Sequence, residues 1–224
     1  MMDFFTSFYF IGPVCIASVI LAVYIIKRAT KNIIYNKLYE SQNKSVSYIY
    51  DILSNEFTDA KVLKSPKLIP DTAVESNNSV KAASDIIFVD KCGVLLINVI
   101  NDKGEFDNPK TGEWRYRFAD SEGNVKIQKI NNPFDATIPQ IRIINELLNH
   151  EGIYSKCVKR MVVYTQNKVR FTYNYSEIVS IDDIIKTIDS MNSQKELTSS
   201  EARVAISAIS DYVDFLEIEE KKKQ

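Results

Sequence analysis

Two polar side chains stand inside apolar stretches, and their types suit the binding of a hard cation. Asp85 lies at the start of the run 84–89, and Asn98 lies deep in the run 94–100. A carboxylate and an amide oxygen are ligands that a divalent cation such as Mg²⁺ accepts, and a bound Mg²⁺ can activate water for hydrolysis. We therefore take Asp85 and Asn98 as the candidate catalytic pair, with Asp85 as the candidate metal ligand.

The element that must position this pair is a β-hairpin. Both runs are short, apolar and rich in β-branched residues, and the segment between them contains Gly93. Two such runs joined by a glycine-containing turn are typical of a hairpin. Both runs are nearly continuous in hydrophobicity, so we expect helices to cover both faces of their sheet.

Further strands and helices are predicted around the hairpin. Residues 158–164 form an apolar run, and residues 114–118 alternate aromatic residues with Arg115 and Arg117. The predicted fold is an α/β domain in which strands 84–89, 94–100, 114–118 and 158–164 form one mixed sheet flanked by helices 45–57 and 139–149. Residues 125–130 are a possible partner strand for 114–118. A helix is expected at 181–191, and Thr198 with Glu201 matches a capping box for a last helix.

The alternating strand at 114–118 supports two interpretations. Arginines between aromatic residues occur on nucleic-acid-binding surfaces, but an ordinary half-buried strand with a solvated basic face has the same pattern. The candidate nucleic-acid-binding residues are Arg115, Arg117, Lys126, Lys129 and Arg142. The formal net charge of −1 provides no large basic field to support this role.

An apolar stretch runs from Phe8 to Ile26 and contains no charged residue. Its length is close to the roughly 20 residues that cross a bilayer. Lys27, Arg28 and Lys31 follow it directly, which is the reverse of a signal peptide. We expect an uncleaved, single-pass anchor in the cell membrane, with the N-terminus outside and the domain facing the cytoplasm.

The predicted organisation has four parts. An anchor with its basic flank occupies residues 1–30, a helical connector 31–44, the α/β domain 45–192, and a C-terminal helix with a charged tail 193–224. Cys15, Cys92 and Cys157 lack the spacing of metal ligands, and we expect them to be reduced thiols in the core or the membrane. His150 is expected at the end of the helix 139–149, where its charge favours the helix C-terminus.

Four features, in order along about residues 45–191, resemble the nuclease-related domain (NERD) of the restriction-endonuclease-like superfamily. They are the strand with Asp85, the Gly93 turn with its following strand, Gly104 with Trp114, and Asn132–Pro133 before a long helix. The resemblance implies a domain that hydrolyses phosphodiesters with Mg²⁺. An aspartate and a glutamate would hold the metal, and a lysine two residues after the glutamate would position or deprotonate the water.

The chain departs from that pattern at most of the reactive positions. The glutamate position is Asn98 and the lysine position is Ile100. No Gly or Glu lies between Ser41 and Ser54, where the first helix of the family usually carries a Gly-Glu pair, and Ala136 replaces an expected glutamine. The sequence therefore predicts a membrane-anchored, inactive or impaired NERD-like domain that acts as a binding module for nucleic acid or protein. No cofactor is expected unless the site is active, in which case it is Mg²⁺.

Two other readings stay open from the sequence. One is an active metal-dependent nuclease with relocated groups, for which the candidates are Asp90, Lys91, Asp102, Lys103 and Glu105. The other is an unrelated membrane-tethered α/β interaction domain. Neither the substrate, nor the partner, nor the oligomeric state follows from the sequence.

Overall fold

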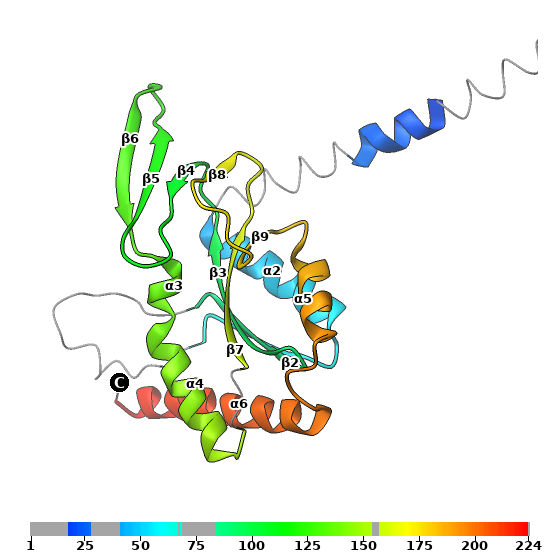
Figure 1. The fold of residues 1–224 in the computed structure, drawn as a ribbon, viewed down its shortest axis with the longest axis vertical. Helices are drawn as coiled ribbons and strands as arrows, with labels where there is room; N and C mark the ends of the chain where they lie inside the picture. Colours follow the sequence, from blue (N-terminus) through cyan, green and yellow to red (C-terminus); the bar gives the residue numbers. More distant parts are fainter. Residues whose placement is uncertain (1–17, 28–40, 67, 69–83, 154–156, 224) are drawn as a thin grey trace, which may run out of the picture.

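The computed structural model describes residues 18–27, 41–66, 68, 84–153 and 157–223 (Figure 1). Its central element is a mixed, five-stranded sheet with the strand order β1-β2-β3-β7-β9. The strands are β1 (Lys61–Lys64), β2 (Ile86–Asp90), β3 (Gly93–Ile100), β7 (Val158–Tyr164) and β9 (Ile178–Ser180). Strand β3 pairs antiparallel with β2 and parallel with β7. The predicted hairpin is therefore confirmed.

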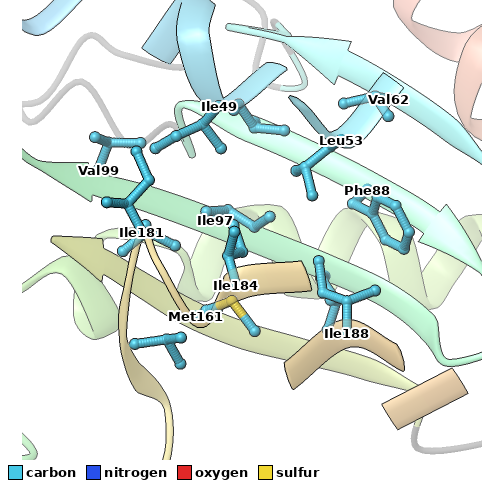
Figure 2. Close-up of a cluster of buried hydrophobic side chains, with 14 of the residues drawn as sticks. Ile49, Leu53, Val62, Phe88, Ile97, Val99, Met161, Ile181, Ile184 and Ile188 are labelled. Carbon is cyan, nitrogen blue, oxygen red and sulfur yellow. The ribbon is translucent and has the colours of Figure 1, made fainter. Parts of the chain in front are cut away.

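Helices cover both faces of this sheet, as the hydrophobicity of the hairpin predicts. On one face α2 (Gln42–Glu56) and α5 (Ile184–Asn192) contribute to one core cluster; on the other, α4 (Ile138–His150) and α6 (Ser199–Lys223) contribute to a second. All eight residues of β3 are buried. Figure 2 shows Ile49 and Leu53 of α2 close to Phe88 and Ile97, with Ile184 beneath them.

A second, four-stranded sheet has the order β6-β5-β4-β8. Its strands are β4 (Gly104–Asp107), β5 (Trp114–Ala119), β6 (Val125–Ile130) and β8 (Val169–Phe171). The placement of 114–118 in the central sheet was therefore wrong, although its pairing with 125–130 is confirmed. Strand β3 already pairs with β2 and β7 on its two sides, so β5 cannot pair with β3. Its Trp114 instead packs among Phe106, Phe134 and Phe171.

The N-terminal prediction is only partly within reach of the structure. Residues 18–27 are helical and exposed. Among the described residues, no helix has both the length and the apolar character needed to cross a bilayer. Residues 8–17 of the predicted span lie outside the described part, as do 28–40 of the flank and connector, so the anchor stays a prediction.

Both cysteines of the described part match their expected state. Cys92 and Cys157 are free and buried. Burial, with the nearby charge of Asp90, raises the pKa of the Cys92 thiol to about 12. Cys15 lies outside the described residues. His150 is the last residue of α4, as predicted.

Candidate functional site

Asp85 lies one residue before β2, beside the carboxyl-terminal half of β3. The pairing of Ile86 with Ile97 places Asp85 opposite Asn98 if the register continues. The Oδ2 atom of Asp85 accepts a hydrogen bond of 2.7 Å from the backbone N–H of Val99. Burial raises the pKa of the Asp85 carboxyl, and the hydrogen bonds from Val99 and Gln42 partly offset that rise. This carboxylate is therefore already used to satisfy the backbone of β3.

Gln42 is a site residue that the sequence reasoning missed. It is the first residue of α2, and its Nε2 donates a 2.6 Å hydrogen bond to the carbonyl of Val99 while its side chain also bonds to Asp85. A lone glutamine at a helix start carries no motif that marks it as a site residue. The helix start was nevertheless signalled by Ser41, whose Oγ accepts from the N–H of Lys44 as an N-cap. An amide therefore reaches the centre from the start of α2.

Asn98 is bound to a different part of the structure. Its Nδ2 donates a 3.0 Å hydrogen bond to the carbonyl of Pro133, the first residue of α3 (Pro133–Ala136). Its Oδ1 is buried and has no hydrogen-bond partner among the residues that the structure describes. The structure thus places Asp85 just before β2 and Asn98 on the adjacent β3, but their side chains bond to different elements. The amide nitrogen of Asn98 makes a contact that an ionised glutamate or aspartate could not make.

The Asn132–Pro133 pair organises the surroundings of Asn98. Asn132 caps α3 by accepting a 2.9 Å hydrogen bond from Phe134, and its Nδ2 donates to the carbonyls of Pro109 and Lys110 at 3.2 Å. The carbonyl of Pro109 also accepts from Trp114 Nε1 at 2.9 Å. This motif therefore connects α3 to the second sheet.

The groups considered as replacements for the missing residues do not gather at Asp85. Asp90 is at the opposite end of β2, where Asn192 Nδ2 donates to it at 2.8 Å. Glu105 is on β4 and forms ion pairs with Arg117 and Arg170. Within the described ranges, no three His, Cys, Asp or Glu side chains are grouped so that they could hold a metal ion.

The lysine position offers no proton-transfer group either. Ile100 is buried in the cluster that includes Phe106, Trp114 and Phe134. Of the other candidates, Lys91 lies in the β2–β3 turn, and Asp102 and Lys103 lie in the loop that follows β3. Burial raises the pKa of Asp102.

The candidate nucleic-acid residues are divided over the surface. Arg115 and Lys129 are cross-strand partners, and Arg117 shares their face of the second sheet. Lys126 is opposite Phe118 on the other face and pairs with Asp120 at 2.9 Å. Arg142 is on α4, outside this sheet.

The face that carries Arg115 and Lys129 is hollowed but not strongly basic. The hollow is lined by Glu105, Asp107, Arg115, Arg117, Ile127, Lys129 and Thr172. Lys129 pairs with Glu113 at 2.9 Å and Arg117 with Glu105 at 3.6 Å. Carboxylates therefore offset most of the positive charge that a phosphate backbone would use.

A family model described as nuclease-related domain matches residues 37–165. The match covers more than half of the 224 residues and contains α2, the β2–β3 hairpin and the Asn132–Pro133 motif. Comparisons with curated proteins and with solved structures gave no match.

Proposed function

Because the chain belongs to the nuclease-related domain family, we propose that it is a member that binds a protein partner and does not cleave nucleic acid. The family's general placement is the restriction-endonuclease-like superfamily. The proposal includes the membrane anchor at residues 8–26, with the domain on the cytoplasmic side. The apolar length and the basic flank Lys27, Arg28 and Lys31 support that part.

The proposal is carried by the chemistry of the two central side chains, which together supply one carboxylate and which both hydrogen-bond to the backbone. Asp85 is the one carboxylate of the pair, and its Oδ2 accepts from Val99. Asn98 is neutral and directs its nitrogen to Pro133. Mg²⁺ demands near-octahedral oxygen ligands and is bound mainly through carboxylates and phosphates. The donor set of this centre, one carboxylate and one neutral amide, does not fit Mg²⁺.

The charge on the second sheet supports a protein as the partner. Four basic residues on its outer face, Arg115, Arg117, Lys129 and Arg170, are accompanied by Glu105, Asp107 and Glu113. Nucleic-acid affinity depends on neutralising phosphates with unpaired Lys and Arg. A mixed-charge face with exposed Ile127 is better suited to a protein.

A metal titration with a cleavage assay on the full chain tests the proposal. The purified protein should show no saturable binding of Mg²⁺ or Mn²⁺ at Asp85, so that wild type and Asp85→Asn give the same titration. It should also leave single- and double-stranded DNA and RNA intact. The family match itself favours a second candidate, a metal-dependent nuclease with relocated ligands. Metal-dependent cleavage that Asp85→Asn abolishes would establish that candidate and reject the proposal.

The proposed topology has its own experiment. Lys168 is exposed on the loop between β7 and β8, so Lys168→Cys in the full chain presents a thiol on the domain. A membrane-impermeant reagent should label it only after cells are opened. Labelling in intact cells, or recovery of the chain in the soluble fraction, would reject this part of the proposal.

A further inference from the structure

Within the described part of the chain, strand β6 forms an uncovered edge of the second sheet. It is the outermost strand in the order β6-β5-β4-β8, and five of its six residues are exposed. Val125 and Ile127 have exposed fractions of 68% and 62%. The β5–β6 hairpin extends beyond the helices that cover the central sheet (Figure 1). An exposed edge strand with apolar side chains is a template for pairing with another strand.

The hairpin register shows which backbone groups of β6 are available. Asp120 donates its N–H to the carbonyl of Asn124, so these two residues form a hydrogen-bonded pair next to the turn. Hydrogen-bonded and non-hydrogen-bonded pairs alternate along an antiparallel ladder. Val125, Ile127 and Lys129 therefore fall at non-hydrogen-bonded positions, with their N–H and C=O groups directed away from β5.

The charges that protect many edge strands are engaged within this sheet. Lys126 pairs with Asp120 and Lys129 with Glu113, each at 2.9 Å. Residues 125–130 contain neither proline nor an acidic residue. Exposed ion pairs contribute only about 0–1 kcal/mol, so an arriving carboxylate can share these lysines at little cost.

We propose that the free edge of β6 binds an extended segment of a partner protein as an added strand of the second sheet. The segment carries two acidic residues three positions apart among apolar residues, because Lys126 and Lys129 lie on opposite faces of the sheet. Main-chain hydrogen bonds to Val125, Ile127 and Lys129 would supply affinity, and the apolar residues and lysines of β6 would select the sequence. A second copy of β6 offers two lysines and no carboxylate, so it lacks the complementary charge. This inference rests on the proposed function as a protein-binding domain.

The probe is a fluorescent, terminally blocked valine peptide with two glutamates three positions apart, titrated against the full chain in detergent and followed by anisotropy. The same peptide with lysines in place of the two glutamates is its charge control. We expect the acidic peptide to bind at least about tenfold more tightly, a difference of about 1.4 kcal/mol. The double variant Lys126→Glu with Lys129→Glu should reverse this preference.

The backbone contribution is tested with Ile127→Pro. Because the N–H of Ile127 points outward, proline there removes a donor from the edge without removing a bond to β5. The proline variant should bind the acidic peptide at least about tenfold more weakly than wild type. Ile127→Thr keeps the N–H, so its loss of affinity should be smaller. Should the proline variant fail to fold, an acidic peptide N-methylated along its length replaces it and should not bind to the wild-type chain.

Equal binding of the two peptides, binding of neither, or binding that survives N-methylation would overturn the inference. All titrations are run with EDTA and again with Mg²⁺. Metal-dependent cleavage of nucleic acid together with intact peptide binding would reject the proposal that the chain does not cleave nucleic acid. It would leave the inference about β6 standing. The two failures are therefore distinguishable.

Discussion

The carboxylate of Asp85 accepts a 2.7 Å hydrogen bond from the backbone N–H of Val99. Asp85 lies just before β2, and Val99 lies near the end of β3. Val99 is buried, so its N–H needs a partner inside the protein. The same carboxylate is raised in pKa by burial. Asp85 thus satisfies the backbone N–H of Val99 at the end of β3, while burial disfavours the charged form of its carboxyl.

This arrangement predicts a pH-dependent contribution of Asp85 to stability. Its pKa in the folded protein lies above the usual 3.8. Its stabilising contribution is therefore complete below the unfolded-state pKa and is lost as the pH rises through the folded-state pKa. Asp85→Asn keeps an oxygen acceptor for Val99 and should raise the free energy of unfolding at neutral pH. Asp85→Ala should lower it by about 1–3 kcal/mol, because a buried N–H is left unpaired.

Urea unfolding of both variants at acidic and neutral pH checks this prediction. The wild-type chain should lose stability relative to Asp85→Asn as the pH is raised from acid to neutral. An Asn variant that is less stable than wild type at neutral pH would show that the ionised carboxylate is favoured by the fold.

The contact between Asn98 and Pro133 gives a prediction about the replaced glutamate. Asn98 Nδ2 donates to the Pro133 carbonyl at 3.0 Å, and an ionised carboxylate has no proton to donate. Asn98→Asp should therefore lower the free energy of unfolding by about 1–3 kcal/mol at neutral pH. The loss should shrink in acid, where the protonated carboxyl can donate.

Gln128→Glu is the matched control, because it makes the same amide-to-acid change at an exposed position on β6. It should change stability by no more than about 0.5 kcal/mol. If Asn98→Asp is as mild as this control, the bond to Pro133 is not what places an amide at position 98.

The capping box before α6 gives a prediction of opposite sign. Thr198 donates from its N–H and hydroxyl to Glu201, and Glu201 donates its N–H to Thr198 Oγ1. The hydrogen bonds from Thr198 lower the pKa of Glu201 below 4.5. Its contribution is present above the unfolded-state pKa and is lost as the pH falls through the lowered folded-state value. A carboxyl NMR titration should show the lowered pKa, and Thr198→Ala should return it toward 4.5.

The β2–β3 hairpin and its surrounding helices could be predicted because their signals are local. Gly93 and the flanking apolar runs determine the turn and the strands, and unbroken hydrophobicity in β3 indicates burial on both faces. The spacing of Ile49 and Leu53, and of Ile144 and Leu148, likewise marks the sides of α2 and α4 that face the sheet.

The placement of β5 and of Gln42 could not be predicted in this way. Whether β5 can pair with β3 depends on β7. Strand β7 begins about sixty positions after the end of β3 and pairs with the side of β3 that β2 leaves open. Gln42 reaches Val99 only because α2 crosses the end of β3, and its residue type carries no motif. Both facts depend on tertiary packing, to which local spacing does not refer.

Two glycines in hairpin turns give a matched pair of substitutions. Gly93 has φ of 99° and Gly123 has φ of 86°, a region that L-residues with side chains adopt at a cost of about 1–2 kcal/mol. A Cβ at Gly93 would overlap the carbonyl oxygen of Cys157 and lie 2.9 Å from its Cβ, whereas a Cβ at Gly123 would meet nothing within 4 Å. Gly123→Ala should therefore cost only the backbone term.

Gly93→Ala should cost the same backbone term plus about 1–3 kcal/mol for overpacking against Cys157. That overlap lies where Val94 donates its N–H to the Cys157 carbonyl at 2.9 Å, so relief would require the start of β7 to move away from β3. Urea unfolding of the two variants measures the difference. Equal losses would mean that the segment at Cys157 yields freely, and that the close approach at Gly93 does not hold β3 against β7.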